Sequence, residues 1–289
     1  MTEHTLENDI LLARVNSLGA ELRSVIRKAD GEEFLWQGGS TRWKASAPNL
    51  FPFVGACRGN RYEYADKFYD MPKHGFARNS EFEMIDSGPG QVTFRLTESE
   101  KTLAVYPFRF SVTIGYRLSG AGIATSYEVE NRDDKEIYFG LGGHPGFNLP
   151  GYPGSGQTYH LEFGQTEGAR PFRAANGLIF DQPDPRFCLD RILDIGPATF
   201  DTDAHIYMNI KSREVSLKNS AGATRLIFRW SGFPHFAVWA VAGAPYVCLE
   251  PWLGHADKAG YPEKLSDKPQ LKHLKPGENF QADFSISVT

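Results

Sequence analysis

Hydrophobic and polar residues alternate along much of this chain with the period of two that half-buried β-strands show. Residues 280–288 alternate most cleanly, and residues 108–118 place aromatic residues at alternate positions. No window of about 12 residues carries a helical i, i+3, i+4, i+7 hydrophobic stripe without a Gly or Pro break. The pattern therefore predicts an all-β protein.

Turn residues separate the predicted strands, as where Asp30-Gly31 follows residues 21–27. Short strands joined by such turns at fairly regular spacing favour a large antiparallel β-sandwich or a barrel. We expect residues 1–289 to form a single domain, with long surface connections at 150–185 and 254–277. The other predicted strands are residues 10–16, 61–64, 67–69, 81–85, 92–96, 123–129, 214–217 and 225–230.

Composition excludes several classes of protein. The 31 basic and 35 acidic residues leave a net charge of -4, which argues against a nucleic-acid binder that works by bulk charge. No stretch reaches the ~18 apolar residues of a membrane span, and residues 1–10 do not resemble a secretory signal. The cysteines, Cys57, Cys188 and Cys248, are odd in number and far apart, which favours reduced thiols. We therefore expect a cytoplasmic protein with no nucleic-acid or membrane partner.

Glu250 and His144 stand where the strand pattern gives way to Gly- and Pro-containing segments. Glu250 follows the apolar run 246–249 and precedes Pro251, so it either points to water or serves as a general base at the rim of a cavity beside Trp252. His144 lies between Gly-Gly and Pro-Gly. It is either a turn residue or a proton donor and acceptor near neutral pH.

His74 and Arg78 flank Gly-Phe-Ala in a third segment of this kind. They either end a surface hairpin or bind a ligand, His74 through a hydroxyl and Arg78 through an anion or a carboxylate.

Motifs for other chemistries are missing. No two histidines form a compact ligand pair, which argues against a metal site made by His74, His144 and Glu250. The chain contains no Gly-x-Ser-x-Gly elbow, phosphate-binding loop or dinucleotide fingerprint. Neighbouring arginines could activate Cys57, although a small buried hydrophobe is its more typical role. We expect no metal and no cofactor.

Five motifs together resemble the aldose 1-epimerase (galactose mutarotase-like) superfamily, in its LacX-related branch, from about Leu12 to Val288. The resemblance implies a large β-sandwich (supersandwich) that binds a sugar in an open cleft, needs no cofactor and interconverts α and β anomers of aldoses. The motifs are Asn49-Leu-Phe-Pro-Phe-Val-Gly55, His74-Gly-Phe-Ala-Arg78, Gly143-His-Pro-Gly-Phe-Asn148, Asp203-Ala-His-Ile-Tyr207 before Ser212-Arg-Glu-Val-Ser-Leu217, and Leu249-Glu-Pro-Trp252.

The resemblance also implies roles for individual residues. Glu250 matches the general base and His144 the general acid, which together should give a bell-shaped dependence of rate on pH. His74 matches the histidine near the ring oxygen, and Asp203 the carboxylate that binds sugar hydroxyls. Trp252 and Phe147 would offer faces for the C–H groups of the sugar ring.

The binding arginine is where this chain departs from its relatives. They often read Val-Gly-Arg, whereas this chain has Val54-Gly-Ala-Cys-Arg58-Gly-Asn-Arg61. By analogy with the Asn-Arg pair of galactose mutarotases we expect Arg61 to bind the sugar, with Arg58 as the second choice.

Three functions remain open at this point. The first is a hexose mutarotase, and the second is a hexose-6-phosphate mutarotase in which Arg58, Arg61 and Arg78 clamp the phosphate. The third is a non-catalytic carbohydrate-binding or sugar-sensing protein. A pure binder would not need Glu250, His144 and His74, so their presence favours catalysis. We expect a small-molecule sugar as ligand and a monomer or homodimer.

Overall fold

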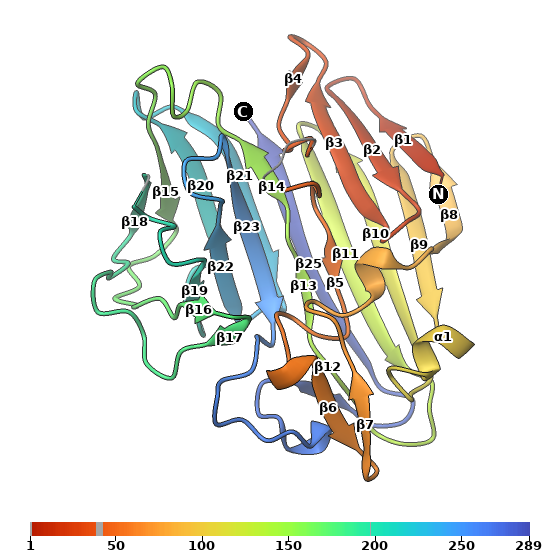
Figure 1. The fold of residues 1–289 in the computed structure, drawn as a ribbon. Coiled ribbons are helices and arrows are strands. Elements are labelled where there is room, and N and C mark those ends of the chain that lie inside the picture. The colour runs from red at the N-terminus through yellow and green to blue at the C-terminus, as the bar shows by residue number, and fades with distance from the viewer. Residues whose placement is uncertain (1, 39–42, 197) are drawn as a thin grey trace.

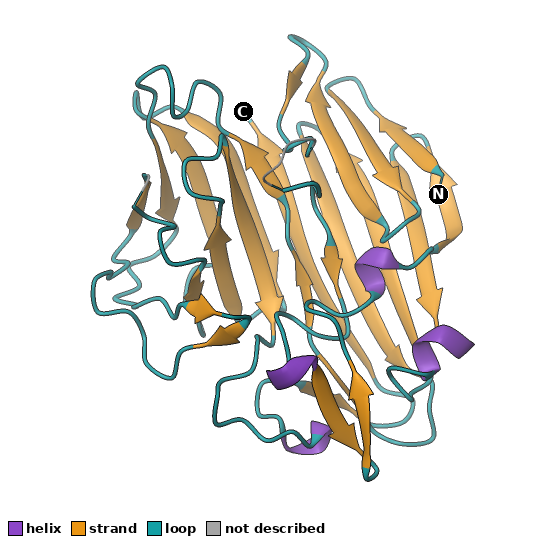
Figure 2. Ribbon diagram, in the orientation of Figure 1, coloured by secondary structure: helices purple, strands orange, loops and turns teal. Residues whose placement is uncertain are grey.

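Two layers of antiparallel β-sheet make up the protein, and helix is confined to short turns (Figures 1 and 2). The structure is a computed structural model that describes residues 2–38, 43–196 and 198–289. The expectation of an all-β sandwich is confirmed.

One layer is a sheet that, among the described residues, contains nine strands, with β25 near its middle between β21 and β11 (Figure 1). Its strands alternate buried and exposed residues because one face covers the core and the other meets solvent. In order across the sheet they are β18 (Ile192–Ile195), β15 (Tyr159–Phe163), β20 (Glu214–Asn219), β21 (Thr224–Ser231), β25 (Asn279–Val288), β11 (Gly122–Asn131), β10 (Phe110–Ser119), β9 (Gln91–Thr97) and β8 (Glu83–Gly88).

Two smaller sheets form the second layer. The β23 sheet contains β19 (His205–Tyr207), β22 (His235–Trp239), β23 (Tyr246–Leu253), β13 (Leu141–Gly143) and β5 (Asn49–Leu50), with β14 (Gly146–Asn148) also paired to β23. The other sheet contains β1 (Glu3–Glu7), β2 (Leu11–Asn16), β3 (Glu21–Arg27) and β4 (Glu32–Glu33).

Aromatic contacts join the two layers. Trp230 of β21 stacks on Phe236 of β22 with ring centroids 4.2 Å apart, and His4 of β1 meets Phe94 of β9 edge-on at 5.3 Å. The heavy aromatic content of the chain thus fills the space between the sheets, where each ring buries a large apolar area.

Short elements connect the sheets. In the part of the chain that the structure describes, no helix is long and apolar enough to cross a membrane. The short pairs are β6 (Arg61–Tyr64) with β7 (Lys67–Asp70), β12 (Ile137–Phe139) with β24 (Lys272–Leu274), and β16 (Ala174–Ala175) with β17 (Leu178–Ile179); the helical turns are α1 (Glu100–Leu103), η1 (Arg58–Asn60), η2 (Ala77–Asn79) and η3 (Leu265–Asp267).

The alternation pattern did not predict β22, and it indicated β23 only as the apolar run 246–249 before Glu250. All but the last residue of β23 are buried, so the strand lacks the alternation that reveals one solvent-facing side. Likewise, the segment 150–185 is more than a surface connection, because it contributes β15 to the large sheet. The segment 254–277 holds η3 and β24.

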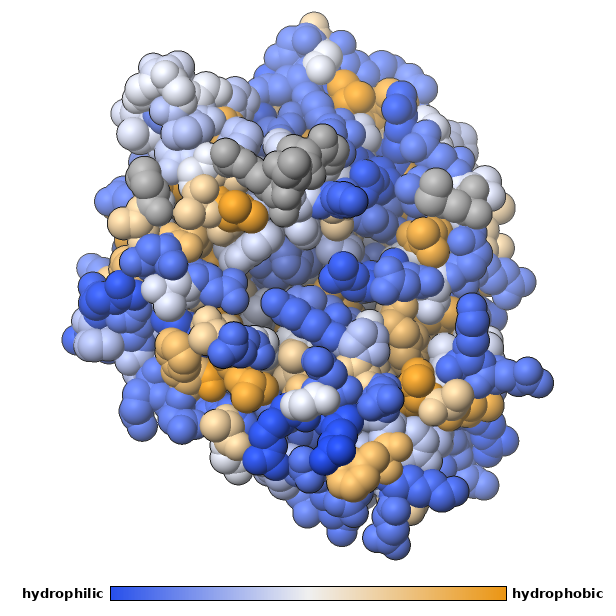
Figure 3. Space-filling model, viewed as in Figure 1, coloured by the Kyte–Doolittle hydropathy of each residue, from blue (hydrophilic) through white to orange (hydrophobic). Residues whose placement is uncertain are grey.

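The visible surface is mostly hydrophilic with scattered hydrophobic residues (Figure 3). Exposed hydrophobic side chains such as Ile10, Phe68 and Phe180 come from separate parts of the chain. Scattered residues of this kind are ordinary on a folded protein.

Asn49 joins three of the sheets through a buried hydrogen-bond network. Its amide nitrogen donates to the carbonyl oxygens of Gly19 and Ala20, each 2.9 Å away, in the turn between β2 and β3. The Tyr127 hydroxyl of β11 donates to its Oδ1 at 2.6 Å. Because Asn49 itself lies on β5 and is 2% exposed, its loss would leave several buried polar groups without partners.

We expect Asn49→Ala to lower the free energy of unfolding by about 3 kcal/mol, because each stranded buried polar group costs roughly 1–3 kcal/mol. Urea denaturation measures this value. The exposed Asn279→Ala is the matched control and should change stability by less than about 0.5 kcal/mol. Equal effects of the two substitutions would contradict the structural role of Asn49.

Candidate active site

A cavity of about 260 Å³ lies over β23 and combines aromatic walls with ionisable side chains. Such a pocket, apolar in part with a few convergent polar groups, is typical of a small-molecule site. Its wall includes Trp43, Gly55, Lys73, His74, Arg78, His144, Asp203, Trp239, Glu250, Trp252 and Ala256.

Strand pairing sets His144 opposite Glu250. Gly142 pairs with Trp252 and Gly146 pairs with Cys248. His144 is midway between the two glycines and Glu250 is midway between their two partners, so the register places them opposite each other. Glycine is needed in these strands because neighbouring rings leave no room for a Cβ atom. At Gly146 a Cβ would lie 2.7 Å from the Trp43 ring.

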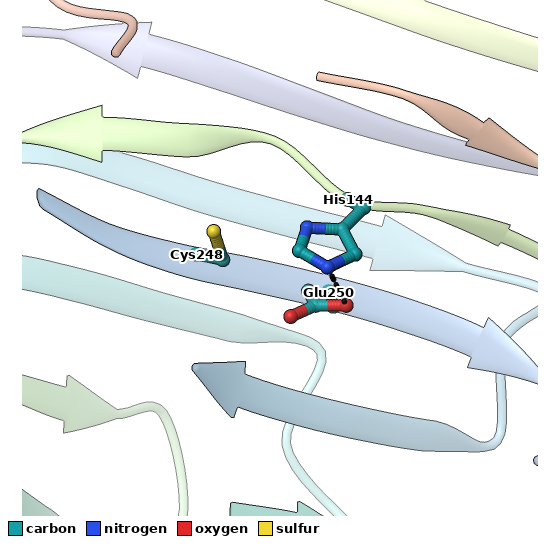
Figure 4. A group of neighbouring side chains, drawn as sticks. All are labelled: His144, Cys248 and Glu250. Atoms are coloured by element: carbon teal, nitrogen blue, oxygen red, sulfur yellow. Dashed lines mark ion pairs between the residues drawn. The ribbon is translucent and has the colours of Figure 1, made fainter. Parts of the chain in front are cut away.

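The two side chains meet in the interior. His144 Nε2 lies 3.1 Å from Glu250 Oε2 (Figure 4). Glu250 is 1% exposed and His144 9%, so neither is the solvent-facing strand end or turn residue that the sequence left open. β23 continues through Pro251 instead of ending at Glu250.

Burial shifts both groups toward their neutral forms. Burial raises the pKa of the Glu250 carboxyl well above its usual value; Asp203 adds to the rise, while Lys73 opposes it. Burial, together with the charges of Arg78 and Lys73, lowers the pKa of His144 to about 3. Burial therefore favours the neutral form of the pair, in which the shared titratable proton is on Glu250.

His74 is held as a neutral hydrogen-bond donor. The Gly55 backbone N–H donates to its Nδ1 at 3.1 Å, which leaves the proton of the neutral ring on Nε2. Burial keeps the pKa of His74 well below its ordinary value, and nearby His144 and Lys73 lower it further. Its ring meets that of His144 edge-on at 5.9 Å.

Asp203 lies two residues before β19 and lines the cavity. One carboxylate oxygen accepts a hydrogen bond from the Ala204 N–H at 2.9 Å. Arg173, 1% exposed, anchors the preceding loop through Asp201 and the Thr199 carbonyl, both 3.3 Å away.

The structure does not place Arg58 or Arg61 in the cavity wall. Their guanidinium groups lie 3.6 and 3.7 Å from Glu263, and Arg61 also stacks over Phe68 at 4.3 Å. The cations of the described wall are instead Arg78, on η2, and Lys73, which adjoins His74 in the sequence.

The aromatic walls differ in part from the expectation. Trp252 lines the cavity, but Phe147 is fully buried and packs on Phe228 in the core. Trp43 stacks on the His144 ring at 5.0 Å, and Trp239 meets it edge-on at 5.7 Å. Neither tryptophan adjoins a motif in the sequence, so only the tertiary fold reveals it.

Asp257 fastens together the loops around the cavity. Its carboxylate lies 2.6 Å from the Lys268 ammonium and accepts hydrogen bonds from the Arg58 backbone N–H and from Gln270. Its backbone N–H donates to the Ala56 carbonyl, and its carbonyl accepts from the Ile179 N–H. The side chain and backbone of one buried residue, Asp257, therefore hold the segments that contribute Gly55, Gly177, Ile179 and Ala256 to the wall.

A family model described as Aldose 1-epimerase matches residues 2–287. The chain belongs to the aldose 1-epimerase family.

Relatives agree with this membership along their whole length. The chromosomal protein LacX of Lactococcus lactis subsp. lactis is 29% identical, over 98% of each chain. A galactose mutarotase related enzyme from Lactobacillus acidophilus is 32% identical with a TM-score of 0.89, covering 100% of this chain and 97% of that one. A galactose mutarotase-like protein from Lactobacillus casei is 29% identical with a TM-score of 0.90 and full coverage of both chains.

We expect Glu250→Gln to stabilise the protein relative to wild type as the pH rises. The folded wild type keeps its raised-pKa carboxyl protonated, whereas the unfolded chain ionises above about pH 4.5, so the wild type loses up to about 1.4 kcal/mol per pH unit that the neutral amide does not lose. Thermal melts of both proteins between about pH 4 and 8 measure the difference. A difference that stays constant with pH would contradict a buried protonated carboxyl.

Proposed function

We propose that the protein is an aldose 1-epimerase that interconverts the α and β anomers of a hexose by opening and closing its ring. The observation that carries the proposal is the buried Glu250–His144 pair, 3.1 Å apart at a cavity of sugar size. The reaction moves protons at two oxygens of one carbon, so its acid and base must converge on one point. Membership of the aldose 1-epimerase family supports the same reaction.

The steps conserve protons. Glu250, ionised, takes the proton of the anomeric hydroxyl, while His144, protonated, gives its proton to the ring oxygen. The bond between C1 and the ring oxygen breaks and C1 becomes an aldehyde carbon. Rotation about the C1–C2 bond exposes the other carbonyl face, and the reverse steps close the ring as the other anomer.

Sugar binding prepares the pair for these roles. The anomeric hydroxyl can donate a hydrogen bond, which stabilises the Glu250 carboxylate, whereas the ring oxygen can only accept one, which stabilises protonated His144. Both forms of the pair hold one proton in total. The sugar thus draws the proton from Glu250 to His144 without exchange with solvent.

Other groups of the wall would hold the sugar. His74 donates from Nε2 to oxygen, and Asp203 accepts from hydroxyls through its remaining oxygen. Trp252, Trp43 and Trp239 offer flat apolar surfaces to the C–H faces of the ring.

We expect Glu250→Gln and His144→Ala each to lower the catalysed rate of anomer equilibration by about 10²–10⁴-fold, since each removes a positioned acid or base. Polarimetry with α-glucose or α-galactose measures the rate above the uncatalysed one. Glu263→Gln, which alters a carboxylate outside the wall, is the matched control and should keep full activity. A Glu250→Gln protein that keeps full activity would contradict the proposal, and an inactive wild type that binds sugar tightly would favour a carbohydrate-binding protein.

A second candidate function is a hexose-6-phosphate mutarotase, and the observation that favours it is the presence of two cations, Lys73 and Arg78, in the wall. The sequence suggested a phosphate clamp of Arg58, Arg61 and Arg78. Of these, Arg58 and Arg61 are not in the cavity wall and lie beside Glu263 instead. Charge-assisted hydrogen bonds from Lys73 and Arg78 could still hold one phosphate.

For this second function, Arg78→Ala should lower kcat/KM for glucose 6-phosphate about 10–100-fold more than for glucose, because only the phosphate loses a charge-assisted contact. A coupled assay of both sugars measures the ratio. Arg61→Ala, outside the cavity, should leave the ratio unchanged. An equal loss for the two sugars would exclude a phosphate contact by Arg78.

A further inference from the structure

Cys248 adds a thiol to the buried acid–base pair. It precedes Glu250 by two residues on β23, so the two side chains leave the strand on the same face. The Cys248 sulfur, one His144 ring nitrogen and one Glu250 carboxylate oxygen all lie within 4.8 Å of one another. In Figure 4 one ring nitrogen points to Glu250 and the other lies on the side of Cys248. The proposed epimerase reaction does not use the thiol.

One buried polar atom of this cluster, a ring nitrogen of His144, has no hydrogen-bond partner among the described residues. His144 Nδ1 is buried without a hydrogen bond, Glu250 Oε2 lies 3.1 Å from His144 Nε2, and Cys248 is a free cysteine with 0% exposure. Buried polar atoms are nearly always hydrogen-bonded, and exceptions concentrate where a ligand or ion binds. The unpartnered ring nitrogen and the close approach of a thiol, an imidazole and a carboxyl group therefore mark the cluster as a candidate ligand site.

The donor set suits one class of ion. A thiolate, a carboxylate and a neutral imidazole carry two negative charges together, which a divalent cation neutralises in a buried site. Sulfur and imidazole ligands favour Zn²⁺ over Mg²⁺ or Ca²⁺, which prefer oxygen. Zinc bonds of about 2.0–2.3 Å place tetrahedral ligands roughly 3.6 Å apart, so the three atoms need to approach by about 1 Å at most.

We propose that His144, Cys248 and Glu250 form a binding site for Zn²⁺ or a similar thiophilic divalent cation, which occupies the acid–base pair and inhibits the enzyme. His144 and Glu250 line the cavity, so the ion enters where the sugar would enter. The inhibition rests on the proposed epimerase function, whereas the binding does not.

Cobalt substitution tests the binding directly, since a Co²⁺–thiolate bond produces a sulfur-to-metal charge-transfer absorption. Titrations use the Cys188→Ala background, which removes the exposed thiol. We expect the band to saturate at one Co²⁺ per chain, to disappear on addition of Zn²⁺, and to be missing in Cys248→Ala. Cys57→Ala, which changes another buried free thiol, is the matched control and should keep the band.

Activity gives the second readout. Zn²⁺ should inhibit anomer equilibration in wild type, and Cys248→Ala should keep its basal rate but need at least about tenfold more Zn²⁺ for the same inhibition, because one of three protein ligands is lost. If Cys248→Ala fails to fold, Cys248→Ser replaces it, since its hydroxyl is nearly the same size and a harder ligand.

Two outcomes would overturn the proposal: no charge-transfer band in wild type, or equal Co²⁺ and Zn²⁺ binding by wild type and the Cys248 variants. A protein that binds Co²⁺ through Cys248 but does not equilibrate anomers would contradict the epimerase function and leave the metal site standing.

Discussion

The pairing of β13 and β14 with the same strand, β23, is the constraint on which the site depends. It fixes His144 across from Glu250, and a shift of either strand by one residue would turn these side chains to the opposite face. Burial shifts the pKa values of this acid and this base toward their neutral forms, which limits the cost of removing the two groups from water. A charged pair in the same place would cost several kcal/mol per ion to desolvate.

The rest of the structure holds this register and the loops above it. Asn49 ties the edge strand β5 to the large sheet through Tyr127, and β5 in turn pairs with β13, which leads into His144. On the open side, Asp257 fastens the loops that carry Gly55, Ile179 and Ala256. The catalytic candidates therefore rest on strands, while the loops that would contact the rest of a sugar are secured by a buried ion pair.

The sequence predicted the strands that have one face toward solvent and one face toward the core. β25, β10 and β11 alternate because one side of the large sheet meets solvent. β22 and β23 could not be found in this way, since the middle three residues of β22 and all but the last residue of β23 are buried and show no period of two.

The same division holds for the site. The structure brings together residues from separate sequence motifs in the wall of one cavity: His74, His144, Asp203, Glu250, Trp252 and Arg78. Arg58 and Arg61 are not part of the cavity wall, because their side chains extend toward Glu263. Glu263 lies far along the sequence, so this pairing depends on the tertiary fold. Trp43 and Trp239 reach His144 only through the tertiary fold.

Burial also explains why, in the proposed mechanism, the reactive protonation state of Glu250 and His144 would require bound substrate. Lys73 favours the Glu250 carboxylate, but Lys73 and Arg78 both oppose a charge on His144, so the fixed charges alone do not bring about the transfer of the proton. A bound anomeric centre supplies what is missing, a donor for the carboxylate and an acceptor for the imidazolium, on a single carbon. In the proposed mechanism, the reactive protonation state would therefore form only with a sugar in the cavity beside the buried pair.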